Sequence, residues 1–276
     1  MNRLSPTVRC AWTNVVELLR WRATQQPDRV AYTFLVNGGP RAVDLTYREL
    51  DRQARAIAVD LESRTSPGAR ALLVYPAGLD FIAAFFGCLY AGVIAVPAFP
   101  PESGRAKRIL PRLRAIVNDS NPAVALTQAA LLPALDMFLA GSNIVSIPHR
   151  IATDRLDASE EAEWKPPGLV GEALAFLQYT SGSTASPRGV MVSHANLLAH
   201  AEMLRNALGL TEQSIISVLA AALSRHGPHW KRVRDTLCRW PMHRDVPRSV
   251  FATAGALASS HYGLSGNNQR RAGFCL

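Results

Sequence analysis

The sequence predicts an α/β fold in which mostly parallel sheets are flanked by helices. Strand-like runs alternate with segments of helical periodicity between residue 14 and about residue 210. Several of these strand-like runs, such as Ala71–Tyr75, are continuously apolar, which is typical of strands that are buried on both faces. Helical segments separate successive strands, as in β-α-β units with parallel strands.

The first elements are bounded by turn signals. Asn14–Gln26 carries apolar residues at helical spacing and is followed by Pro27-Asp28, so we expect a helix that ends there. Ala31–Val36 is an apolar strand. Asn37–Pro40, with sequence NGGP, is expected to be a turn.

A capping box predicts the start of the next helix. Thr46 and Glu49 have the spacing in which each side chain bonds to the backbone N–H of the other residue. The helix that follows has an apolar face made by Leu50, Ala54, Ile57, Ala58 and Leu61.

Residues 81–101 carry no charge and are long enough to span a bilayer. Glycines and prolines interrupt this stretch, so we do not expect a membrane span. The pattern favours a buried helix over Asp80–Ala91, a turn at Gly92 and a buried strand over Val93–Ala98.

The remaining elements before the central motif continue the alternation. Arg105–Asn118 is expected to be a basic amphipathic helix, Ala123–Thr127 a strand and Ala129–Ala140 a helix. Asn143–Ile147 is expected to be a further strand, and Pro148–Gly171 a polar connection.

The most informative segment is LQYTSGSTASPRGVMVSH, residues 177–194. It contains hydroxyl residues, two glycines and one cation: Thr180, Ser181, Gly182, Ser183, Thr184, Arg188 and Gly189. Glycines let a backbone approach a ligand closely, successive N–H groups form an anion nest, and hydroxyls and a guanidinium add donors. Five such residues alone would favour a flexible surface loop, but together with their flanks the pattern predicts a polyphosphate-binding loop.

The flanks of this loop distinguish it from a Walker A site. That motif has the pattern G-x-x-x-x-G-K-[ST] and opens a helix, whereas here the loop lies between the strand-like ALAFLQYT and a second strand that contains Val190 and Val192. A helix is expected over His194–Leu208 with Ser193 as its N-cap. For His194 we expect a surface position beside the cap, with a polar contact as the alternative.

Composition limits the location and the partners of the chain. The four cysteines (Cys10, Cys88, Cys238 and Cys275) have no disulfide-framework or metal-ligand spacing, and no signal peptide is recognised, so a cytoplasmic location is expected. The net charge is +9, but residues 217–276 hold nine cations and two anions and therefore contribute +7 of it. The rest of the chain is almost neutral and gives no nucleic-acid signal.

Several segments together resemble the N-terminal part of a fatty acyl-AMP ligase, a branch of the adenylate-forming superfamily. They are QPDRVAYTFL, LTYRELDRQARAIA, ALLVYPAGLDFIAAFFGCLYAGVIAVPAFPP, PAVALT and FLQYTSGSTASPRGVMVSHANLL, and they span most of residues 25–210. The resemblance implies a partial N-terminal domain of an adenylate-forming enzyme over residues 1–216.

The resemblance also implies a reaction. A fatty-acid carboxylate attacks the α-phosphate of ATP, giving acyl-adenylate and pyrophosphate, and the acyl group then passes to an acyl carrier protein. Mg²⁺ is expected with ATP, and the similar acyl-CoA ligases use coenzyme A instead. Two residues depart from the family pattern: Ala185 stands where a glycine is usual, and Arg188 stands where a lysine is usual.

The resemblance stops at about residue 216, and a shift of reading frame is the explanation that we favour for residues 217–276. Reading possible codons of Ser224–Trp230 one base later gives H-D-M-G-L-I-G, which resembles the family's continuation. On this hypothesis the basic tail is poorly ordered. The chain is then a truncated, inactive version without the family's magnesium ligand and catalytic lysine.

Three readings of the function therefore stay open at the level of the sequence. The first is an acyl-activating ligase of the acyl-AMP or acyl-CoA type. The second is a non-catalytic, nucleotide-binding remnant. The third is a nucleic-acid-binding protein that uses the basic tail, which is disfavoured because the tail has no recognisable binding module.

Overall fold

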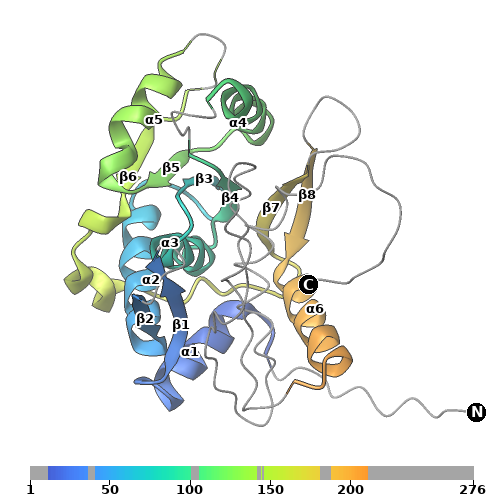
Figure 1. Cartoon of the computed structure of the whole chain (residues 1–276). Helices are drawn as coiled ribbons and strands as arrows, with labels where there is room; N and C mark the ends of the chain where they lie inside the picture. Colours follow the sequence, from blue (N-terminus) through green and yellow to red (C-terminus); the bar gives the residue numbers. More distant parts are fainter. Residues whose placement is uncertain are drawn as a thin grey trace, which may run out of the picture.

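The computed structural model describes residues 12–36, 41–100, 106–141, 144, 146–180 and 188–210 (Figure 1). A six-stranded sheet has the order β6-β5-β3-β4-β7-β8, and a separate two-stranded sheet pairs β1 with β2. The strands are β1 Val30–Leu35, β2 Ala42–Thr46, β3 Arg70–Val74, β4 Ile94–Ala98, β5 Val124–Thr127, β6 His149–Ala152, β7 Leu174–Thr180 and β8 Arg188–Ser193.

The large sheet is mostly parallel, as the sequence predicts. Strands β3 to β7 pair in parallel, and β8 pairs antiparallel to β7. The chain leaves β3 for β4 on one side and returns to β5 on the other, so the strand order reverses at β3. In open α/β sheets, ligands bind beyond the carboxyl ends of the strands near such a reversal.

Helices cover both faces of this sheet (Figure 1). One face packs against α1, α2, α3 and α6, and the other packs against α4 and α5. Alternate strand residues supply the two cores, so that Leu73 belongs to the first core and Leu72 to the second. The helices are α1 Val15–Gln25, α2 Tyr47–Glu62, α3 Leu79–Tyr90, α4 Ala106–Ser120, α5 Leu132–Leu139 and α6 His194–Ala207, with short 3₁₀ helices η2 Ala129–Leu131, η3 Thr153–Arg155 and η4 Ala158–Glu163.

Local signals in the sequence explain where several helices begin. The capping box at α2 is present, because the Thr46 hydroxyl accepts from the backbone N–H of Glu49 and the Glu49 carboxylate accepts from the backbone N–H of Thr46. Asn14 caps α1, and Ser193 caps α6 as predicted. After α3 the chain turns at Gly92, whose φ of +65° favours glycine.

The predicted strand over Asn143–Ile147 is wrong. The described residues in that range form no strand, and β6 lies at His149–Ala152, inside the segment expected to be a polar connection. Within the described part of the chain, β6 is the edge strand and pairs with β5 alone, and Ile151 is the one buried residue of β6. Periodicity does not reveal such a strand, while Ile147 packs in the core without belonging to one.

Strand β2 was not predicted as a strand. It pairs antiparallel with β1 over Ala42–Thr46 and is mostly exposed. The turn signal at residues 37–40 stands between two segments of alternating pattern and could have indicated the β1–β2 hairpin. Residues 37–40 themselves lie outside the described residues.

A buried cluster of charges joins α1, α2 and α3. The Asp51 carboxylate is almost fully buried and accepts from the Tyr90 hydroxyl at 2.8 Å. It also pairs with Arg20 at 3.0 Å and with Arg55 at 2.9 Å. Arg55 in turn donates to the backbone carbonyl of Glu161 in η4. The cluster therefore holds the connection before β7 against the helices of the first core.

The charge-free stretch of residues 81–101 forms α3 and β4 rather than one long helix. Within the described part of the chain, no helix has the length and apolar character needed to cross a membrane. Cys88, in α3, is a free and buried thiol whose pKa is raised by burial. The other three cysteines lie outside the described residues.

Candidate functional site

The two strands that flank the predicted phosphate loop form an antiparallel hairpin, β7–β8, at one edge of the large sheet. In its register, Thr180 lies opposite Arg188, and Tyr179 lies opposite Gly189. The structure thus brings together three of the predicted site residues: Thr180, Arg188 and Gly189. The other four (Ser181, Gly182, Ser183 and Thr184) and Ala185 lie outside the described residues.

The position of this hairpin end suits an anion. Strand β7 runs parallel to β4, so Thr180 is at the carboxyl edge of the parallel sheet, where ligands of α/β folds bind. Arg188 begins β8 with its side chain exposed to solvent. A guanidinium in that position is available to form a forked pair of hydrogen bonds with a phosphate.

Gly189 allows a close approach here and does not have an unusual backbone conformation. It is not among the described glycines with positive φ. A Cβ at this position would lie 3.0 Å from Cζ of Tyr179 and 3.2 Å from its hydroxyl oxygen. Such distances are too short for an ordinary contact, so glycine at 189 lets β8 pack directly on the tyrosine ring.

Tyr179 is the residue that the sequence analysis missed. Its ring is 3% exposed and packs in the second core beneath α4. Its hydroxyl donates to the Asp119 carboxylate at 2.5 Å, and its backbone carbonyl accepts from the Arg112 guanidinium at 3.1 Å. Burial, followed by the bond to Asp119, raises the pKa of the Tyr179 hydroxyl well above its usual value, so it stays protonated and remains a donor.

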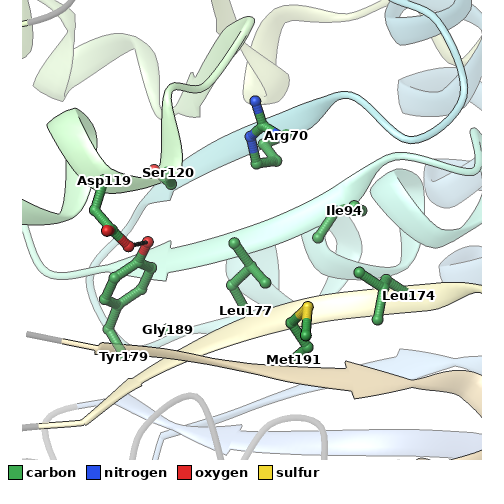
Figure 2. A pocket seen from close by; sticks show the side chains of 9 residues that line it. All are labelled: Arg70, Ile94, Asp119, Ser120, Leu174, Leu177, Tyr179, Gly189 and Met191. Carbon is green, nitrogen blue, oxygen red and sulfur yellow. Dashed lines mark hydrogen bonds between the residues drawn. The ribbon is translucent and has the colours of Figure 1, made fainter.

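A pocket of about 350 Å³ lies beneath the hairpin on the face that α4 covers (Figure 2). One end of it is closed by the Tyr179–Asp119 contact, whose two side chains point toward each other in Figure 2. Its lining residues come from β3, β4, α4, β7 and β8; they are Arg70, Ile94, Asp119, Ser120, Leu174, Leu177, Tyr179, Gly189 and Met191.

His194 anchors the other end of the hairpin, where β8 leads into α6. The prediction of a surface position is wrong, because the residue is 1% exposed. Its Nδ1 accepts from the backbone N–H of Val15 at 3.3 Å, so it completes the first turn of α1. Burial lowers the pKa of His194 to about 4, which keeps Nδ1 unprotonated and able to accept.

A second pocket, of about 320 Å³, lies between α2, the start of α3 and η3. Its two carboxylates already have protein donors: Asp80 accepts from Gln128, and Asp154 accepts from the backbone N–H of Ala129 at 2.8 Å. Both acidic side chains of this pocket are therefore already engaged by the protein.

The described residues do not by themselves make a metal site. No group of three or more His, Cys, Asp or Glu side chains among them is close enough to hold an ion. Mg²⁺ is commonly bound through substrate phosphates and one or two carboxylates, so the expected magnesium ion would be brought by ATP.

The chain is similar to known proteins over most of its length. The family model described as AMP-binding enzyme matches residues 19–224, and so runs slightly past residue 216, where the sequence analysis places the end of the resemblance. A medium-chain fatty-acid–acyl-carrier-protein ligase, JamA of Moorena producens, is 44% identical over 244 residues, which cover 87% of this chain and 40% of that protein. The long-chain-fatty-acid–AMP ligase FadD32 of Mycolicibacterium smegmatis is 36% identical, covering 70% of this chain and 31% of that one.

Solved structures show the same likeness. The crystal structure of a fatty acid AMP ligase from Legionella pneumophila superposes with a TM-score of 0.65 at 36% identity, over 73% of this chain and 34% of that protein. A fatty acyl-adenylate ligase from the same organism, in complex with acyl adenylate and pyrophosphate, has a TM-score of 0.64 at 34% identity, over 74% of this chain and 34% of that one. The chain thus spans two fifths or less of the length of these relatives.

Proposed function

The chain belongs to the AMP-binding enzyme family, and from this premise we propose that its β7–β8 hairpin binds the triphosphate of ATP for the activation of a fatty acid. The binding residues are Thr180, Ser181, Gly182, Ser183, Thr184, Arg188 and Gly189. The observation that carries the proposal is the register of the hairpin, which sets Arg188 opposite Thr180 at the carboxyl edge of the sheet.

For the whole protein we propose the formation of an acyl-adenylate. The fatty-acid carboxylate attacks the α-phosphorus of ATP, a new P–O bond forms, and the bond to the β-phosphate breaks with release of pyrophosphate. The hairpin's part is to hold the β- and γ-phosphates in place and to offset their charge, because phosphoryl-type transfer depends mainly on positioning and charge stabilisation.

The proposed partners follow from the relatives. JamA carries acyl-carrier-protein ligase in its name, FadD32 is called an AMP ligase, and FadD21 of Mycobacterium tuberculosis is called a putative fatty-acid–CoA ligase. For the whole protein we therefore propose a fatty acid as substrate, Mg²⁺ accompanying ATP, and an acyl carrier protein or coenzyme A as acyl acceptor, in the cytoplasm. We also propose that residues 1–216 form the adenylation part and that residues 217–276 are a separate tail.

Two measurements on the 276-residue chain test the proposal. Isothermal titration calorimetry with ATP is expected to give saturable binding, which weakens in Arg188→Gln because a phosphate contact is lost. Fatty-acid-dependent exchange of labelled pyrophosphate into ATP tests activation itself. Exchange supports the ligase, and ATP binding without exchange supports a non-catalytic nucleotide-binding chain. An absence of both contradicts the proposal.

A further inference from the structure

We propose that Asp119 and Arg112, both on α4, are positioning residues for the triphosphate: they hold Tyr179 by its hydroxyl and its carbonyl and so set where Thr180 and Arg188 meet the nucleotide. This inference rests on the proposed function, because it assumes that ATP binds at the end of the hairpin. We call Tyr179, Asp119 and Arg112 the α4 clamp.

The hairpin needs such a clamp because its backbone pairing to the rest of the sheet is short. Strand β3 pairs with β4 over five residues, from Arg70 to Val74. In contrast, the register of β4 with β7 contains a single pair, Ala95 with Phe176, three residues before Tyr179. Among the described residues β8 pairs with β7 alone. The register pair with β4 therefore lies short of Tyr179, and contacts from other elements help to fix the end of the hairpin that carries the proposed phosphate-binding residues.

The α4 clamp supplies the missing constraint at two points of one residue. The Tyr179 hydroxyl donates to Asp119, near the end of α4, and the Tyr179 carbonyl accepts from Arg112, two turns earlier. Tyr179 is therefore held at two points, the hydroxyl of its side chain and its backbone carbonyl. The ring is also packed in the core with Leu113, Ile116 and Val117 of the same helix.

The opposing strand transmits this constraint to the cation. Gly189 lies directly opposite Tyr179 in the register and has no Cβ, so its backbone rests on the tyrosine ring. Arg188 is the next residue along β8 and lies opposite Thr180. The position of the Arg188 backbone therefore depends on how the Tyr179 ring lies against Gly189. The position of that ring in turn depends on its contacts with α4.

The chain offers a matched control at the opposite edge of the sheet. Asp136 of α5 pairs with Arg150 of β6 at 2.7 Å, which is again a carboxylate that binds a side chain of an edge strand. Strand β6 is the edge remote from β8. Asp136→Asn therefore removes a comparable charge without touching the hairpin.

The test is isothermal titration calorimetry of the 276-residue chain with ATP and, separately, with tripolyphosphate, for Tyr179→Phe, Asp119→Asn and Asp136→Asn. Tyr179→Phe keeps the packed ring and removes only the donor. For the two clamp variants we expect the Kd for both probes to rise about five- to tenfold, which corresponds to the loss of one ordinary hydrogen bond, at unchanged stoichiometry. The control variant is expected to bind as the wild type does.

The stoichiometry separates positioning from folding. If the clamp served only stability, its loss would lower the fraction of chains that bind and leave the Kd unchanged, and that result would overturn the inference. Unchanged binding in both clamp variants would also overturn it, while leaving the proposed function intact. A wild-type chain that binds neither probe would overturn the proposed function itself. Asp119→Glu, which keeps the acceptor, is expected to recover part of the lost affinity.

Discussion

The four strands β6, β5, β3 and β4 differ from the β7–β8 hairpin in how they are held. The four strands pair over four or five residues each and are covered by helices on both faces. The hairpin has one register pair with β4, and two of its side chains, those of Val190 and Met191, are at least half exposed. Contacts from helices hold it instead, through Tyr179 at one end and His194 at the other.

The difference indicates that the two parts of the sheet have different roles. Backbone pairing and burial of β3, β4 and β5 between the two cores make the four-strand part a support for the hairpin. In the hairpin, Arg188 is exposed opposite Thr180, and polar contacts to helices hold its two ends. Substitutions in the first part are therefore expected to lower the global free energy of unfolding. Those in the hairpin are expected to act on local order and on nucleotide binding.

The largest expected effect comes from breaking the buried charge cluster. Asp51→Ala leaves the buried Tyr90 hydroxyl without its acceptor and removes the partner shared by Arg20 and Arg55, so the free energy of unfolding is expected to fall by about 2 to 4 kcal/mol. Urea denaturation followed by circular dichroism measures it. The control is Asp28→Ala, since the Asp28–Arg48 pair is exposed and its loss is expected to cost less than about 0.5 kcal/mol. Equal effects of the two substitutions would contradict the comparison.

The next largest effect is a pH dependence of the free energy of unfolding, which originates at His194, directly after β8. The pKa of His194 is about 4 in the folded chain and about 6.5 when exposed, so the unfolded chain takes up a proton first as the pH falls. Its stabilising contribution is complete above about pH 6.5 and is lost progressively down to pH 4, by at most about 3 kcal/mol. His194→Asn keeps an acceptor for the N–H of Val15 without this titration. The difference in unfolding free energy between the variant and the wild type should therefore change between pH 6.5 and 4, and a constant difference would refute the assignment.

A smaller effect is expected where α2 and α3 touch. A Cβ on Gly87 would lie 2.7 Å from Cβ of Ile57, so Gly87→Ala overpacks this contact and is expected to cost about 1 to 3 kcal/mol, despite the better helix propensity of alanine. Thermal denaturation measures the change. In an Ile57→Ala background the same substitution should cost less, because the branched side chain is gone. A double-mutant cycle without coupling would contradict this prediction, because it would mean that the two helices move apart without a measurable cost.

The smallest expected effects come from two helix caps. One is on α2, which packs against the large sheet, and the other is on α6, which directly follows the hairpin. Thr46→Ala and Ser193→Ala each remove a side-chain acceptor from the first turn of a helix and are expected to cost about 1 kcal/mol. Hydrogen exchange distinguishes them: loss of the Thr46 cap should raise exchange throughout the four-strand part, whereas loss of the Ser193 cap should raise it mainly in α6. Uniform acceleration in both variants would mean that the molecule opens as one unit.

Much of the fold could be predicted from local patterns. Both caps, the buried helix and strand around Gly92, and the strands on either side of the predicted phosphate loop were predicted from residue types and periodicity, and they are confirmed. Each of these features depends on residues within one or two turns of each other. The edge strand β6 escaped prediction because a strand paired on one side needs little apolar sequence.

The site was predictable only in part. Thr180, Arg188 and Gly189 were singled out from their types and spacing, and the structure brings them together at one end of a hairpin. Tyr179 was overlooked because a tyrosine in a strand is unremarkable by itself. Its partners Asp119 and Arg112 lie 60 and 67 residues away in the sequence, and no spacing rule connects them.

By itself, the sequence determined most of the helices and strands and the hairpin strands on either side of the predicted phosphate loop, because capping, periodicity and turn chemistry act over a few residues. The tertiary structure alone decided that Tyr179 meets α4 and that His194 is buried against α1. These contacts follow from the strand order and from how the helices divide between the two faces. They arise from packing between distant segments, which no local pattern encodes.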